Sequence, residues 1–360
     1  MHKANFILTD IMKTGNHQSL EGFIKFNTLT NERIDVEGEY YTLHNYKLES
    51  YDRKLAILDV RIENIRLNVD HFYIELGRRL EKLSKQGFKF IYATPWESKA
   101  NFDEQKNKFI PQPDPNVYTG YHWFGGVSWF WYFMIMKHIT RRYDLKHNEK
   151  KYDFLYLNKV PRQHRKDLYK HLKSKNLIDN SLTSFTKHPT NPHDLDKDYE
   201  LPFLKRTEFY PAYGMDQEVY AKPYEATMAS IVSETNVNNT DVFITEKLWK
   251  AVLMEHVFVV HGNQHYLKTI QGMGFKTFSN IIDESYDNEP DQQKRIEKLT
   301  KTIEDLKRKD WKEIYQQTES IRKHNKQHFY NKKSFSEQVN KEMLSWFKFF
   351  DSSQVSSTKS

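Results

Sequence analysis

Three consecutive residues, Thr245, Glu246 and Lys247, have the types and spacing that suit a phosphate and sugar site. Apolar residues recur at helical spacing after them, so we predict an N-cap at Thr245 and a helix beginning at Glu246. The free N–H groups and the positive dipole end of a helix start favour an anion, with the Lys247 ammonium as its partner. The Glu246 carboxylate would accept hydrogen bonds from ribose hydroxyls. The structural alternative is that Glu246 only complements the helix dipole and Lys247 is a solvated surface charge.

A cation-rich turn lies earlier in the chain. Residues 152–158 (YDFLYLN) have a strand pattern, residues 159–165 (KVPRQHR) follow, and a helix is predicted over 166–175. Open α/β sheets hold phosphates in such turns, beyond the carboxyl ends of their strands. Positive charge at a helix start opposes the dipole by about 0.3–1 kcal/mol, and a bound anion would relieve this conflict. The alternative is a basic helix start that faces solvent.

A longer pattern surrounds the first site. It contains, in order, an apolar strand that ends at Glu234, the polar loop 235–241, FITEK at 243–247, GFKTF at 274–278 and DESYD at 283–287. This pattern resembles the C-terminal half of family 10 glycosyltransferases, the α-1,3-fucosyltransferase-like enzymes, in their small bacterial and viral form. The resemblance implies an α/β fold of the glycosyltransferase B type, in which two Rossmann-like domains face a cleft.

The resemblance also implies an activity. A nucleoside-diphosphate sugar, GDP- or UDP-linked, would be the co-substrate, and a fucose-like or other sugar would pass with inversion to a hydroxyl of a glycan or lipopolysaccharide. Arg165 is the match for the family's diphosphate-binding arginine, with Arg162 in reserve. Because Arg165, Lys247 and backbone amides would neutralise the leaving diphosphate, we expect no metal and no further cofactor.

The base that accepts the acceptor's proton is, in the family, a glutamate of the N-terminal domain. Glu97 fits this position, because residues 88–94 read as a strand that Pro95 ends. The sequence around Glu97 departs from the family motif, and a loop or helix-start glutamate is the alternative interpretation. Asp10 and Asp59 are weaker candidates.

Two further side chains are predicted to contact the base or the sugar. Glu234 ends a predicted strand over residues 228–233, and Asn239 lies in the loop that follows, with Asn236 as an alternative. In DESYD, Asp283 more simply caps a short helix. The sequence Asp194-Leu195-Asp196 lies in a polar loop and is interpreted as surface, so no bound metal is predicted.

The length of 360 residues predicts two domains. We expect an acceptor-side domain over residues 1–147 and a nucleotide-sugar-binding domain over 148–290. Residues 291–350 would form helices that can return to the first domain, and residues 351–360 a loose tail. In the first domain, strands are predicted at 6–9, 55–60 and 88–94, a helix at 69–86, and an acceptor-contacting loop at 98–126.

Composition narrows the class of protein. With no cysteine, the chain has no disulfide, thiolate zinc site or cysteine nucleophile, which suits a cytoplasmic protein. The first residues lead directly into a strand pattern, so we expect no signal peptide. The most apolar run, residues 127–136, is too short to span a membrane, although peripheral contact with a membrane stays open. The sequence does not indicate an oligomeric state.

The net charge of +7 suits polyanions in general and leaves two alternative functions open. One is a phage- or virus-type glycosyltransferase that acts on a hydroxymethylated DNA base. The other is a glycan-binding protein without catalysis. The basic residues are spread along the chain, so no dense cluster marks a nucleic-acid site.

Overall fold

The computed structural model describes the chain in parts. Side chains are described for residue 129 and for residues 150–158, 162–184, 221–237, 242–331, 333–334 and 337–338. Five N-terminal strands are described by their backbone alone. The chain divides into two compact units, Met1–Trp131 with Phe335–Ser360 and Tyr132–Ser334. The domain boundaries predicted at residues 147, 290 and 350 stay predictions.

The five strands of the first unit form a mixed sheet in the order β2-β3-β1-β4-β5. They are β1 (His2–Asp10), β2 (Thr30–Arg33), β3 (Glu39–Tyr46), β4 (Tyr51–Asp59) and β5 (Lys89–Ala93). β4 runs parallel to β1 and β5, and β3 antiparallel to β1 and β2. The three strands predicted here are confirmed as β1, β4 and β5. Asp10 and Asp59 pair in register at the strand ends, whereas Glu97, the helix predicted at 69–86 and the loop 98–126 lie outside the described residues.

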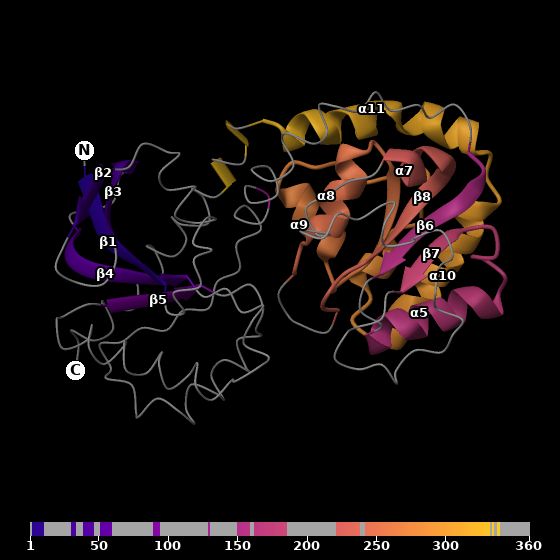
Figure 1. Cartoon of the computed structure of the whole chain (residues 1–360), viewed down its shortest axis with the longest axis horizontal. Coiled ribbons are helices and arrows are strands. Elements are labelled where there is room, and N and C mark those ends of the chain that lie inside the picture. Colours follow the sequence, from indigo (N-terminus) through magenta and orange to yellow (C-terminus); the bar gives the residue numbers. More distant parts are fainter. Residues whose placement is uncertain are drawn as a thin grey trace, which may run out of the picture. The chain divides into compact units, whose positions relative to one another are not determined.

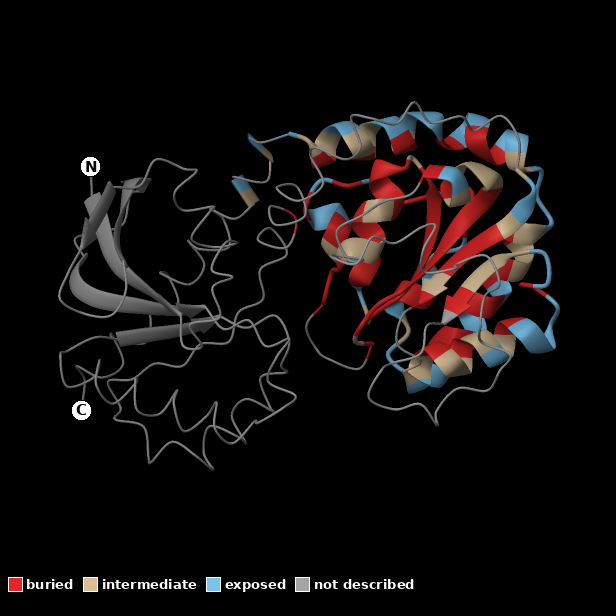
Figure 2. Ribbon diagram, in the orientation of Figure 1, coloured by how far each residue is buried: buried red, intermediate tan, exposed pale blue. Residues whose placement is uncertain are grey.

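The second unit contains a four-stranded parallel sheet in the order β7-β6-β8-β9. Its strands are β6 (Tyr152–Asn158), β7 (Leu182–Phe185), β8 (Thr227–Ser233) and β9 (Val257–His261). Every residue of β8 and β9 is buried (Figure 2), as expected for parallel strands covered on both faces. The unit is therefore an α/β domain with a Rossmann-like sheet.

Helices cover both faces of this sheet. They are α5 (Gln163–Ser174), α7 (Ala221–Ala226), α8 (Glu246–Leu253), α9 (Tyr266–Gly272), the 3-10 helix η4 (Ser285–Asn288), α10 (Gln292–Lys307) and α11 (Trp311–Phe329). Figure 1 shows α8 and α11 on one side of the sheet and α5 and α10 on the other. The buried Trp249 ring joins α8 to α11, because its centroid lies 5.5 Å from that of Phe329.

The order of the strands creates a topological switch point. From β6 the chain passes through α5 to β7 on one side, whereas β8 lies on the other side of β6. In open parallel sheets, ligands bind beyond the carboxyl ends of the strands at such a point. Here these ends are Asn158 of β6 and Ser233 of β8, and Glu234 comes directly after β8.

Candidate functional site

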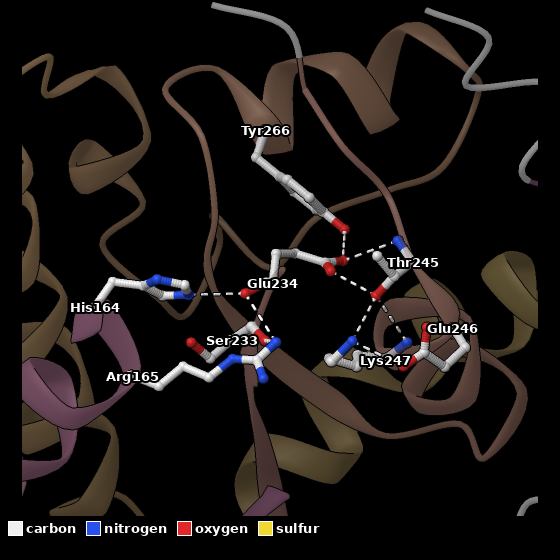
Figure 3. Close-up of polar contacts among 8 residues, drawn as sticks. All are labelled: His164, Arg165, Ser233, Glu234, Thr245, Glu246, Lys247 and Tyr266. Carbon is white, nitrogen blue, oxygen red and sulfur yellow. Dashed lines mark hydrogen bonds and ion pairs between the residues drawn. The ribbon is translucent and has the colours of Figure 1, made fainter. Parts of the chain in front are cut away.

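The start of α8 has the predicted geometry. Thr245 is the N-cap, with an extended backbone (φ −117°, ψ −179°), and its hydroxyl accepts a hydrogen bond from the Lys247 backbone N–H at 3.4 Å. The Lys247 ammonium donates to Thr245 Oγ1 at 3.1 Å and to Glu246 Oε1 at 2.8 Å (Figure 3). The side chains of Glu246 and Lys247 are 16% and 18% exposed, so the pair is accessible but partly desolvated.

Electrostatics keep Glu246 ionised. Burial alone would raise its pKa, but the charges of Lys247 and Lys250 and the hydrogen bond from Lys247 lower the pKa to about 2. A carboxylate at this place accepts hydrogen bonds and does not supply protons at neutral pH. Glu246 therefore has the chemistry of an acceptor for ligand hydroxyls.

Glu234 joins three elements of the site. Its fully buried carboxylate accepts hydrogen bonds from the Thr245 backbone N–H (3.1 Å), the Thr245 hydroxyl (2.5 Å) and the Tyr266 hydroxyl (2.6 Å) (Figure 3). Burial raises the pKa of Glu234, an effect that Lys247 and the hydrogen bonds oppose. The end of β8 thus fixes the start of α8 and the first residue of α9. The contact with base or sugar predicted for Glu234 stays a prediction.

Arg165 approaches the same place from α5. This helix starts at Gln163, three residues before the predicted start, so Arg165 lies in its first turn. The side chain is 2% exposed, and its guanidinium donates to the carbonyl oxygens of Ser233 (3.3 Å) and Glu234 (3.1 Å). Arg162 occupies the N-cap position of α5, and the first turn contains no acidic residue. The cationic helix start predicted from the sequence is therefore present, beside the end of β8.

Two histidines complete the polar cluster, and neither was predicted. His164 Nε2 donates to the Glu234 carbonyl oxygen at 3.0 Å, and its ring lies edge-on to the ring of His261, with centroids 5.6 Å apart. Burial lowers the pKa of His164 to about 4 and lowers the pKa of His261 well below its ordinary value. Both imidazoles are therefore neutral at pH 7. Their places in the sequence, beside Arg165 and at the end of the apolar run VFVVH (257–261), are the signals that could have indicated them.

The loops around the site are tied to the helices. Arg295 of α10 donates to the carbonyl oxygens of Val237 (3.2 Å) and Gly262 (2.8 Å), which follow β8 and β9. In DESYD, Asp283 accepts from the Ser285 N–H at 2.9 Å. The N-cap of η4 is nevertheless Glu284, one residue later than predicted, and its side chain makes no capping hydrogen bond. Asp287 similarly holds the start of α9, where its carboxylate accepts from two backbone N–H groups.

Of the predicted site residues, the structure brings Arg165, Glu234, Thr245, Glu246 and Lys247 together at the carboxyl end of β8 (Figure 3). Arg162 begins the helix that carries Arg165. Asn239 lies outside the described residues, as do Glu97, Asp194 and Asp196. Cations from two helix starts and the hydroxyl acceptor Glu246 therefore meet at one strand end, an arrangement that can bind an anion bearing hydroxyls.

The described part of the chain contains no group of three or more His, Asp or Glu side chains placed to hold a metal ion. Its helices include none with the length and apolar character needed to cross a membrane. No known protein family, curated protein or solved structure matches the chain.

Proposed function

We propose that the protein is a nucleotide-sugar-dependent glycosyltransferase and that the starts of α5 and α8 bind the diphosphate of its donor. The observation that carries the proposal is the Thr245-capped start of α8, where Lys247 and Glu246 lie beside the switch point of a parallel sheet. The Lys247 ammonium suits the diphosphate, and the Glu246 carboxylate suits hydroxyls of ribose or sugar. The resemblance of this segment to family 10 glycosyltransferases supports the same assignment.

The surroundings of α8 support a preorganised anion site. The guanidinium of Arg165 is held by the carbonyl oxygens of Ser233 and Glu234, while Glu234 also holds the N-cap Thr245. Both cationic helix starts are thus fixed to one residue. Donors that are already in place cost little reorganisation when charge develops on a leaving diphosphate.

The proposed reaction is a displacement with inversion and without a metal. An acceptor hydroxyl attacks the anomeric carbon, the new glycosidic bond forms, and the bond to the diphosphate oxygen breaks. The hydroxyl proton passes to a base, for which Glu97 is the candidate, and the nucleoside diphosphate leaves with the electron pair. The acceptor would bind to the N-terminal domain, in the two-domain arrangement of the glycosyltransferase B type.

The test is donor binding by the full chain and by two lysine variants, one at the start of α8 and one on α10. Thermal shift and calorimetry with GDP- and UDP-sugars, with and without EDTA, should show binding that EDTA does not weaken. Lys247→Ala should weaken binding about 10- to 100-fold, because a charge-assisted hydrogen bond contributes about 1.5–3 kcal/mol.

Lys301→Ala is the control, because the exposed Lys301 ammonium pairs with Asp305 on α10. The affinity of this variant for the donor should be within about threefold of the parent's, well below the tenfold change that ~1.4 kcal/mol represents. If no nucleotide sugar stabilises the protein, or if both variants lose binding equally, the proposed site is wrong.

A further inference from the structure

A row of polar side chains crosses the carboxyl edge of the sheet beside the proposed site. Ser233 pairs with His261 in the register of β8 and β9. Leu155 pairs with Ser230, so Asn158 stands level with Ser233, three residues further along each strand. Neighbouring strands are about 4.8 Å apart. Asn158, Ser233 and His261 are therefore consecutive positions across β6, β8 and β9, at the switch point and next to it.

The row lies on the face of the sheet that α5 covers. Residues two apart in a strand share a face, so Asn158 points to the same side as Tyr156. The Tyr156 hydroxyl donates to the carbonyl oxygen of Arg165 in the first turn of α5. At the other end of the row, the ring of His261 meets that of His164, also in this turn. Asn158 thus faces the helix start that is proposed to bind diphosphate.

The Asn158 amide is buried without a hydrogen bond to any described residue. The residue is 3% exposed, yet neither Oδ1 nor Nδ2 has a partner in the described part of the chain. On the same row, Nε2 of the buried His261 also lacks a partner there. A buried polar group without a partner costs about 1–3 kcal/mol. Such groups are rare in folded proteins, and a ligand or a bound water is the usual explanation.

The donor and acceptor atoms of the amide indicate which chemical group would complement it. Asn158 offers one acceptor and two donor hydrogens in one plane, which is the complement of a nucleobase edge where a donor stands beside an acceptor. We propose that Asn158 binds the nucleobase of the donor, next to the diphosphate site at the starts of α5 and α8. This inference rests on the proposed function, since it assigns the nucleoside part of the same ligand.

The experiment compares nucleoside diphosphates with inorganic pyrophosphate. Calorimetry on the full chain with GDP, UDP, ADP and pyrophosphate gives the preference for a nucleoside, which is the ratio of the nucleoside diphosphate affinity to the pyrophosphate affinity. Asn158→Leu should reduce this preference roughly 10- to 100-fold, the usual range for one bidentate pair with a base, and leave pyrophosphate affinity unchanged. Asn158→Ala, which adds no volume, should have the same effect.

The melting temperature of the free protein separates binding from a structural role. Asn158→Leu replaces an amide that has no partner among the described residues by an apolar side chain. It should therefore melt at the same or a higher temperature than the parent. Asn325→Leu is the matched control. That buried amide accepts from the Lys276 N–H and donates to the Lys276 carbonyl, both at 2.8 Å. Its variant should melt lower and keep the nucleoside preference.

Three results would overturn the inference. If both Asn158 variants keep the parent's preference, a water alone satisfies the amide. If they lose affinity for pyrophosphate and for nucleotides by the same factor, Asn158 positions the diphosphate site and does not contact the base. If both melt well below the parent, the amide is structural. Failure of the proposed function is a separate result, in which the parent itself binds neither nucleotide nor pyrophosphate.

Discussion

The hydroxyl of Thr245 has three roles at the candidate site. It caps α8 by accepting from Lys247, and it donates to the buried carboxylate of Glu234. The same oxygen also accepts from the Lys247 ammonium, the group proposed to bind phosphate, and so holds this ammonium in place. One small side chain therefore connects the helix start, the strand end and the cation.

Replacing this hydroxyl by a methyl group should cost stability. We expect Thr245→Val to lower the free energy of unfolding by about 1–3 kcal/mol, since it removes an N-cap and one donor to a buried carboxylate. Thr245→Ser, which keeps the hydroxyl, should lose less than about 1 kcal/mol, since only a methyl group is removed. Urea unfolding followed by Trp fluorescence measures both. Equal stability of the two variants would show that the hydroxyl contributes nothing.

His164 should make stability depend on pH in a defined window. Its pKa is about 4 in the folded protein and 6.5 ordinarily, so the folded state resists protonation. A base whose pKa is lowered by folding contributes fully to the free energy of unfolding above about pH 6.5. This contribution is lost as the pH falls towards 4.

We expect His164→Gln, which keeps a donor for the Glu234 carbonyl oxygen but does not titrate, to reduce this loss of stability between pH 6.5 and 4. Because the pKa of His261 is lowered too, part of the pH dependence should remain. Chemical denaturation at several pH values measures it. A variant with the same pH profile as the parent would contradict this role of His164.

The sequence predicted the residues of this site unevenly. The Thr245 cap follows from local signals, since a capping residue and the helix after it are neighbours in sequence. The contacts of His164 and Tyr266 with Glu234 join residues 70 and 32 positions apart, so no local pattern indicates them. The amide of Asn158, which has no partner among the described residues, is buried by the packing of α5 over the strand end, which the sequence does not specify.

At the scale of elements, the short turn between β9 and α9 requires glycine. A Cβ on Gly262 would lie 2.6 Å from Cδ2 of Tyr266, closer than packed carbon atoms approach. The Tyr266 ring must stay where it is, because its hydroxyl donates to Glu234. Gly262 thus lets α9 start close enough to β8 to support the carboxylate.

Gly262→Ala should therefore destabilise the protein by about 1–3 kcal/mol, the usual cost of overpacking. Gly272→Ala is the control, because a Cβ there meets no atom within 4 Å. Gly272 is the last residue of α9, where alanine should be neutral or stabilise by up to about 1 kcal/mol. Urea unfolding of both variants tests the contrast, which disappears if Tyr266 can move without cost.

The elements themselves were largely predictable where the pattern was local. The strands predicted at 152–158 and 228–233 correspond to β6 and β8. The start of α5 was predicted three residues late, because its N-cap position holds Arg162 and lacks a capping side chain. The charged stretch 292–325 contains a break that separates α10 from α11, where Asp310 caps the second helix.

At the scale of the whole molecule, the charge of +7 bears on the type of ligand. A basic protein attracts any polyanion, so net charge alone does not separate a nucleotide sugar from DNA. Salt dependence does separate them. A protein that neutralises many DNA phosphates releases many counterions, whereas a diphosphate offers few charges.

We therefore expect donor binding to weaken by less than about tenfold when salt rises from 50 to 200 mM. Duplex DNA bound through 6–10 phosphate contacts would lose roughly 10³–10⁵ in affinity over the same range. Calorimetry with GDP- and UDP-sugars, and gel shift with plain and hydroxymethylated duplex, measure the two dependences. Sugar transfer to hydroxymethylated DNA, together with steep salt dependence of duplex binding, would contradict a glycan acceptor and favour the DNA-modifying alternative. No specific duplex binding and no sugar transfer to hydroxymethylated DNA would contradict the DNA-modifying alternative, whatever the salt dependence of the donor, because both alternatives use the same nucleotide sugar.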